Sequence, residues 1–129
     1  MNAPMVLKDG KLWGVLGTPG ADNQVQVNTQ VLTAMLDLGA DPQTALESPR
    51  WTSSQAGQGA NYPHEGDGAL TIEEDFGPDI LAGLARRGHN LKRVAHLAGP
   101  CAMQAIRLLD NGVRMAGSDP RRDGWAAAY

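Results

Sequence analysis

The chain begins with two short apolar runs that a polar turn separates. Residues 5–7 and 12–16 flank Asp9-Gly10, and this dipeptide between apolar runs predicts a two-residue β-hairpin. The segment Gly17-Thr-Pro-Gly20 follows at once. The pattern therefore predicts two strands that lead directly into a glycine turn.

A helical period follows this turn. Over residues 25–38, apolar side chains recur three and four positions apart, at Val27, Val31, Ala34, Met35 and Leu38. Gly39 then supplies a C-terminal cap, because glycine adopts the left-handed conformation at no steric cost. Asp41 and Pro42 suit the N-cap and the first turn of a second, short helix that reaches about Glu47.

The second half alternates between turn-rich and apolar segments. Residues 52–68 hold four glycines and few apolar side chains, which predicts an exposed loop. Residues 69–73 then predict a strand, and Gly77-Pro-Asp79 opens a helix that Gly88 closes. We expect this helix to bury Ile80, Leu81 and Leu84.

Two further regions complete the pattern. Residues 90–94 alternate, and 102–109 and 113–116 flank Asp110-Asn-Gly112, which predicts a second hairpin. About six strands and three helices indicate an α+β fold, or a layered αββα arrangement, in one domain that spans residues 1–129.

Composition and charge narrow the classes of function. Eleven Lys and Arg against fourteen Asp and Glu give a net charge of −3, which disfavours nucleic acid and anionic membranes as partners. A single cysteine excludes an internal disulfide and a Cys-rich zinc site. No run reaches the roughly 18 apolar residues of a membrane span, so we expect a soluble chain, periplasmic or cytoplasmic.

The sharpest candidate for chemistry is the segment Gly17-Thr-Pro-Gly-Ala21, between a strand end and a helix start. Backbone N–H groups and the helix dipole converge there, so the turn can hold an oxyanion, a carboxylate or a phosphate. Neither a Walker loop nor a Gly-x-Gly-x-x-Gly fingerprint is present. The alternative interpretation is a turn with no ligand.

Other reactive side chains lack partners at useful spacing. The histidines are scattered and offer no metal-ligand pattern, the serines do not lie in a Gly-x-Ser-x-Gly elbow, and Cys101 is expected to be a small buried residue. We interpret the acidic run 73–75 as solvated charge ahead of a helix. No metal and no cofactor are predicted. The histidines and serines considered for these roles are His64, His89, His96, Ser53, Ser54 and Ser118.

The arginines near prolines are interpreted as structural. A guanidinium can satisfy several carbonyls or one carboxylate, which is how irregular segments are held in place. We therefore expect Arg50, Asp119 and Arg121 to be structural residues, with Arg50 and Arg121 making buried charge-assisted hydrogen bonds.

Several of these segments occur together in one known order. The sequence resembles the C-terminal part of the small subunit of the gamma-glutamyltransferase (gamma-glutamyltranspeptidase) family, and the similarity covers nearly the whole chain. The most specific segment is Gly117-Ser-Asp-Pro-Arg-Arg-Asp-Gly124 with a closing Tyr129. The other matching stretches are 2–5, 8–13, 17–20, 48–51, 78–89 and 103–106.

This resemblance implies part of an N-terminal-nucleophile hydrolase, an αββα sandwich made by autocleavage of a precursor. In the family, an N-terminal threonine attacks a gamma-glutamyl or related amide, and the acyl-enzyme passes to water or an amine. The threonine lies upstream of the segment matched here. The resemblance thus implies a partial sandwich that lacks the strands carrying the nucleophile, and a fragment that is inactive alone.

The resemblance places Gly20 and Ala21 at the oxyanion hole, where the family has consecutive glycines. Alanine keeps its N–H, so the hole survives where the backbone does not need a positive φ. The family's best-known members continue with Ser-Arg, whereas this chain has Asp22-Asn-Gln24. Glutathione and another acyl amide are therefore both open as substrates, and the substrate-binding residues are unknown.

Three hypotheses remain open at this point. The first is a piece of an amide-cleaving enzyme whose partners are the large subunit and the rest of the small subunit. The second is a non-catalytic anion-binding module, and the third is a structural or dimerisation module. Missing strands would leave an open sheet edge and an uncovered apolar face, so we expect the fragment to self-associate.

Overall fold

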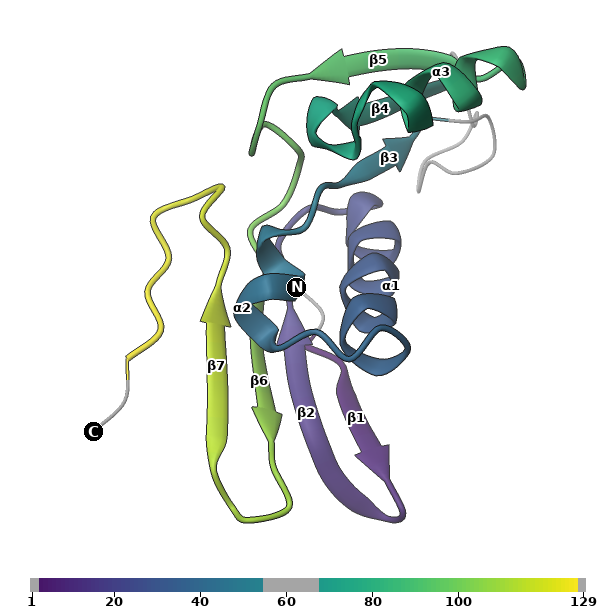
Figure 1. Cartoon of the computed structure of the whole chain (residues 1–129). Helices are drawn as coiled ribbons and strands as arrows, with labels where there is room; N and C mark the ends of the chain where they lie inside the picture. The colour runs from purple at the N-terminus through teal and green to yellow at the C-terminus, as the bar shows by residue number, and fades with distance from the viewer. Residues whose placement is uncertain (1–2, 55–67, 128–129) are drawn as a thin grey trace. The chain divides into compact units, whose positions relative to one another are not determined.

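The computed structural model describes residues 3–54 and 68–127, which form two compact units (Figure 1). The first unit combines Met1–Ser48 with Cys101–Tyr129, and the second is Pro49–Pro100. Helices and strands occur in both units, which confirms the predicted α+β class. Within the described residues, no helix is long and apolar enough to cross a membrane.

An antiparallel four-stranded sheet with the order β1-β2-β6-β7 forms the centre of the first unit. Its strands are β1 (Met5–Lys8), β2 (Lys11–Gly17), β6 (Gln104–Leu108) and β7 (Arg114–Ser118). Both predicted hairpins are confirmed. Asp9 and Gly10 have φ of 51° and 74°, the positive values that a tight two-residue hairpin turn requires. The pairing of β2 with β6 joins the two hairpins.

Two helices follow β2 and lie over one face of this sheet (Figure 1). Helix α1 (Asn23–Leu36) starts slightly earlier than the apolar spacing predicts, and Gly39 turns the chain after it with a φ of 72°. Helix α2 (Pro42–Glu47) has the predicted bounds. The two predicted helices of this half are therefore confirmed.

Asp41 caps helix α2 as predicted. One carboxylate oxygen accepts hydrogen bonds from the backbone N–H groups of Gln43 (2.9 Å) and Thr44 (3.1 Å). The Thr44 hydroxyl donates to the other oxygen at 2.6 Å, and this bond is the main reason why the pKa of Asp41 lies below its ordinary value. The cap holds the start of α2 most firmly when Asp41 is ionised.

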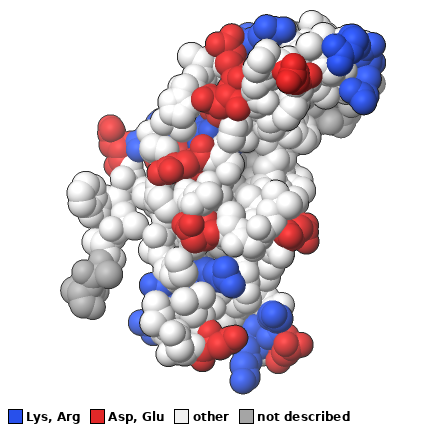
Figure 2. All heavy atoms as spheres, viewed as in Figure 1, with Lys and Arg blue, Asp and Glu red and all other residues white. Residues whose placement is uncertain are grey.

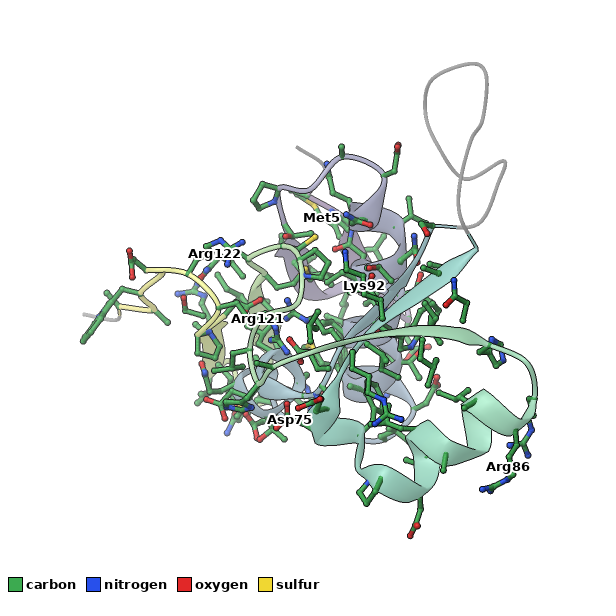
Figure 3. All side chains as sticks on the ribbon, turned by 90° about the horizontal axis from the view of Figure 1, so that it is seen from above. Met5, Asp75, Arg86, Lys92, Arg121 and Arg122 are labelled. Atoms are coloured by element: carbon green, nitrogen blue, oxygen red, sulfur yellow. The ribbon has the colours of Figure 1, made fainter. Side chains whose placement is uncertain are left out.

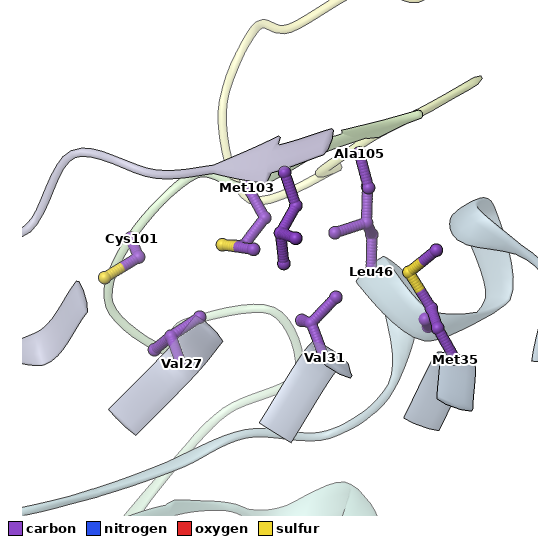
Figure 4. Close-up of a cluster of buried hydrophobic side chains, with 9 residues drawn as sticks. Val27, Val31, Met35, Leu46, Cys101, Met103 and Ala105 are labelled. Carbon is purple, nitrogen blue, oxygen red and sulfur yellow. The ribbon is translucent and has the colours of Figure 1, made fainter. Parts of the chain in front are cut away.

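The core of the first unit lies between these helices and the sheet (Figure 4). One side of α1 contributes Val27, Val31 and Met35, as the apolar spacing predicts. The other buried members are Leu16, Ala45, Leu46, Cys101, Met103 and Ala105. Leu38 was predicted on the same side of the helix, but it is 78% exposed because α1 ends at Leu36.

The second unit is a small β-α-β layer. Strand β4 (Ala69–Glu73) pairs parallel with β5 (Asn90–Val94), and the 3-10 turn η1 (Glu74–Phe76) and helix α3 (Pro78–Arg86) connect them. Strand β3 (Trp51–Ser53) pairs antiparallel with β4. The predicted strands β4 and β5 and helix α3 are thus confirmed.

Parts of the predicted loop and of the α3 face are wrong. Thr52 and Ser53 belong to β3, because they pair with β4 despite the polar sequence around them. Residues 55–67 of that predicted loop lie outside the described residues. On α3, Leu81 is buried as predicted, whereas Ile80 is 53% exposed.

Glu73 is a further correction, because the acidic run 73–75 was predicted to be solvated. The Glu73 side chain is 1% exposed, and its carboxylate accepts the backbone N–H groups of Arg50 (3.0 Å) and Gly99 (2.7 Å). The Glu73 N–H in turn donates to the Arg50 carbonyl at 3.0 Å. This carboxylate therefore ties together the two chain segments at which the second unit begins and ends.

A buried ion pair holds the C-terminal segment of the first unit. The Arg121 guanidinium contacts Asp119 Oδ1 at 3.2 Å, and both side chains are fully buried. It also donates to the carbonyls of Leu46 (2.8 Å) and Ser48 (3.0 Å). Arg122, the next residue, is exposed; Figure 3 shows the two arginines on this segment. Arg121 thus links the segment after β7 to the end of α2.

We predict that Arg121→Ala destabilises the protein strongly. Removing one partner of a buried pair leaves an uncompensated carboxylate and costs about 3–5 kcal/mol, so Tm should fall by more than about 10 °C. Arg122→Ala is the matched control and should change the free energy of unfolding by less than about 0.5 kcal/mol. Thermal unfolding followed by circular dichroism measures both. Equal midpoints for wild type and Arg121→Ala would contradict this role.

Candidate functional site

The glycine turn lies where the sequence places it, between the end of β2 and the start of α1. Gly17 is the last residue of β2, and α1 begins at Asn23. Gly20 and Ala21 are exposed, whereas Thr18 between them and the strand is fully buried. The turn therefore lies at the surface, beside the positive end of a fourteen-residue helix.

Hydrogen bonds within this turn use its carbonyls. The Gly20 carbonyl accepts from Asn23 N at 3.0 Å, and the Ala21 carbonyl accepts from Gln24 N at 3.1 Å. Within the described residues, the N–H groups of Gly20 and Ala21 donate to no other group. Both amides therefore have their hydrogen-bonding capacity open to an anion or to water.

The conformation of this turn is left-handed at two successive residues. Gly20 has a φ of 142° and Ala21 a φ of 46°. The backbone therefore needs a positive φ at Ala21, contrary to the sequence-based condition, and Ala21 adopts this φ and keeps its N–H. An L-residue pays roughly 1–2 kcal/mol in the left-handed helical region, so Ala21 holds a position that glycine would occupy without strain.

The segment Cys101-Ala102, distant in the sequence, packs against the inner side of the turn. The Thr18 hydroxyl accepts a hydrogen bond from Ala102 N at 3.0 Å and donates to the Pro19 carbonyl at 2.7 Å. Cys101, buried and with a φ of 78°, packs its sulfur so close to Gly20 that any Cβ at position 20 would collide with it. Sequence reasoning missed this contribution, because residues 18 and 102 are 84 positions apart.

An apolar groove of about 340 Å³ borders the turn on the sheet side. Its lining includes Gly17, Thr18 and Pro19 from the turn, and Val15 and Ile106 from the neighbouring strands. Gly20 and Ala21 lie outside this lining. The groove therefore offers apolar contact next to the two open amides rather than further charge.

The remaining candidate residues make local contacts of their own. His96 Nδ1 lies 2.8 Å from Asp75 Oδ1 at an exposed position, and Ser54 donates to the Ala69 carbonyl at 3.2 Å. Ser118 accepts from the Gln104 side chain at 3.0 Å. His64 lies outside the described residues. None of these contacts pairs a serine with a histidine.

Charge and metal-ligating groups add little to the site. Acidic and basic side chains are interspersed on the face that Figure 2 shows. In the part of the chain that the structure describes, no three His, Cys, Asp or Glu side chains lie close enough together to hold a metal ion. The chemistry that the described turn offers is therefore that of two backbone N–H donors.

Known proteins match this chain over nearly its whole length. The sequence model described as Gamma-glutamyltranspeptidase matches residues 1–129. The chain is 36% identical over 125 residues to the Glutathione hydrolase-like YwrD proenzyme of Bacillus subtilis, covering 95% of this chain and 22% of that protein. It is 30% identical over 130 residues to the Glutathione hydrolase proenzyme of Escherichia coli, covering 100% of this chain and 20% of that protein.

The fold is also similar to that of a solved acylase. The crystal structure of cephalosporin acylase from Bacillus halodurans superposes with a TM-score of 0.80 and 31% identity, over 97% of this chain and 22% of that one. The chain thus spans about a fifth of the length of the relatives that it matches. Because the family model covers every residue, the chain belongs to the gamma-glutamyltranspeptidase family.

Proposed function

We propose that this chain forms part of an amidohydrolase that cleaves glutathione or a related acyl amide through an acyl-enzyme on a threonine outside these 129 residues. The open turn at Gly20 and Ala21 is the observation that carries the proposal. In this role the two N–H groups receive the oxygen of the tetrahedral intermediate, whose negative charge develops as the threonine attacks the carbonyl.

The geometry of the turn supports this role in three ways. Both residues are exposed, and their N–H groups have no acceptor among the described residues. Helix α1 begins directly after them, so its dipole favours negative charge at this point. The buried Thr18 and Cys101 fix the turn from behind, which preorganises the donors before a substrate arrives.

The acyl group of the substrate stays open between two classes. Of the three similar proteins described above, one is named a glutathione hydrolase, one glutathione hydrolase-like and one a cephalosporin acylase. Asp22-Asn-Gln24 follows the turn in this chain, where the family's best-known members continue with Ser-Arg. We propose that this segment is where the choice between glutathione and another acyl amide is made.

The sheet of the first unit carries a second, independent part of the proposal. Met5, Val15, Ile106 and Ala116 lie opposite one another across the four strands and therefore share one face. The neighbouring row, Leu16-Ala105-Gly117, faces the helices and is buried. Met5 is 69% and Ile106 43% exposed. We propose that this apolar face packs against the second sheet of an αββα sandwich.

The alternative function is a non-catalytic module. In that case the turn binds an anion without cleavage, or the apolar face serves only to form a dimer. The turn geometry fits anion binding equally well, so catalysis by a proenzyme that contains this segment separates the two functions.

The first prediction from the proposed function compares Gly20→Ala with Ala21→Gly, both made in a proenzyme that contains this segment. Gly20→Ala should lower kcat by at least about tenfold, toward the 10²–10³-fold loss seen when an oxyanion donor is removed, because its Cβ collides with Cys101. Ala21→Gly keeps the N–H, should retain kcat within about twofold, and should stabilise the protein by roughly 0.5–1 kcal/mol because strain is relieved.

Steady-state hydrolysis of gamma-glutamyl p-nitroanilide and of a cephalosporin side-chain amide provides the measurement. Unchanged kcat in a folded Gly20→Ala enzyme would contradict the oxyanion assignment. A loss of kcat in Ala21→Gly equal to that in Gly20→Ala would show that the alanine side chain, rather than the backbone geometry, matters.

The second prediction concerns the 129 residues by themselves. The purified chain should neither cleave gamma-glutamyl anilides nor become labelled by a glutamine-analogue inactivator, because the proposed nucleophile lies outside it. Mass spectrometry of the inactivator-treated chain is the measurement, with an active proenzyme as the positive control. Stoichiometric labelling of any residue in this chain would overturn the proposed division of the site.

The third prediction tests the apolar face. The isolated chain should self-associate in a concentration-dependent manner, because an exposed apolar row on an open sheet favours contact with a second apolar surface. Ile106→Lys should weaken this association. Val25→Lys is the matched control, since Val25 is 70% exposed on α1. Sedimentation velocity that shows a monomer for wild type, or equal association for both variants, would argue against this face.

A further inference from the structure

We infer that Thr18 is a positioning residue that sets the direction of the Gly20 and Ala21 amides. This inference rests on the proposed function of those amides as oxyanion donors. Thr18 itself stays behind the turn, fully buried, and offers no group to a substrate. Its contribution is to hold together two segments that the chain brings from opposite ends.

The hydroxyl of Thr18 is used in both directions. Its oxygen accepts from Ala102 N at 3.0 Å, and its proton goes to the Pro19 carbonyl at 2.7 Å. The second bond orients the peptide unit that directly precedes Gly20. The first bond anchors the segment that precedes β6 to the end of β2. The buried Thr18 hydroxyl therefore fixes both the Pro19–Gly20 peptide and the segment at Ala102.

Cys101 turns this anchoring into a constraint on Gly20. It directly precedes Ala102, so the Thr18–Ala102 bond fixes the position of its backbone, which is left-handed with a φ of 78°. The Cys101 sulfur in turn occupies the place where a Cβ of residue 20 would lie. Gly20 is thus confined between its own peptide bond to Pro19 and the Cys101 side chain.

Loss of the Thr18 hydroxyl should release both constraints at once. Oxyanion stabilisation requires donors within a few tenths of an ångström of the position that the charged oxygen will reach, so a small rotation of the Pro19–Gly20 peptide is costly. The substrate in its ground state does not depend on these donors to the same extent. The expected effect is therefore on kcat rather than on KM.

The catalytic test uses Thr18→Val and Thr18→Ser in a proenzyme that contains this segment. Valine matches threonine in shape but lacks both hydrogen bonds, and serine keeps the hydroxyl. We expect Thr18→Val to lower kcat by about 10–100-fold with KM within about threefold, and Thr18→Ser to stay within about threefold of wild type in kcat. A folded Thr18→Val enzyme with wild-type kcat would overturn the inference.

A second measurement on the 129-residue chain is independent of activity. In ¹⁵N-labelled protein, Thr18→Val should shift the amide resonances of Gly20, Ala21 and Ala102. Thr29→Val is the matched control: the Thr29 hydroxyl donates to the Val25 carbonyl at 2.8 Å on the exposed side of α1, so its shifts should stay within that helix. Unchanged Gly20 and Ala21 resonances in Thr18→Val would overturn the inference.

The two measurements separate this inference from the function on which it rests. A wild-type proenzyme that cleaves no acyl amide contradicts the proposed function, and the amide shifts then still decide whether Thr18 positions the turn. Should Thr18→Val not fold, Thr18→Ser carries the test. A loss of kcat beyond tenfold in that variant, with unchanged amide shifts, would assign the effect to the lost methyl group and overturn the role of the hydroxyl.

Discussion

The buried pair of Asp119 and Arg121 is the interaction on which the rest of the first unit depends. Asp119 accepts Met103 N at 2.9 Å and Arg121 N at 3.0 Å through its two carboxylate oxygens, and the Arg121 guanidinium balances its charge. The same guanidinium satisfies the carbonyls of Leu46 and Ser48. Burying a charge away from water costs free energy unless the charge is paired. Any arrangement that separates Asp119 from Arg121 is therefore unfavourable, and the segment after β7 is held in place.

This arrangement extends from the pair to the turn through consecutive backbone groups. Met103 N is bound by Asp119, and the preceding Ala102 N is bound by Thr18. The segment before β6 is therefore fixed on one side by the C-terminal pair and on the other by the end of β2. The Cys101 side chain of this segment leaves no space for a Cβ at position 20. The family motif around residues 117–124 thus supports the candidate site without forming part of it.

Local sequence signals predicted the local structure well. Asp9-Gly10 and the turn at Gly112 gave both hairpins, and Asp41 gave the start of α2, because each depends on a few neighbouring residues and on backbone angles that only certain residue types adopt. Two of the wrong predictions share a cause. Strand β3 and the burial of Glu73 depend on partners about twenty residues away, and no local period reports such pairing.

The sequence alone determined most of the elements, the family, and the turn in which the family resemblance places two candidate amides. Only the tertiary structure decided that Ala21 is left-handed, that the Cys101 sulfur blocks a side chain at position 20, and that the Thr18 hydroxyl binds Ala102. The physical reason is distance along the chain. Burial and hydrogen bonding across 84 residues follow from how β2 and β6 pair, and this pairing minimises the free energy of the whole unit rather than that of any short segment.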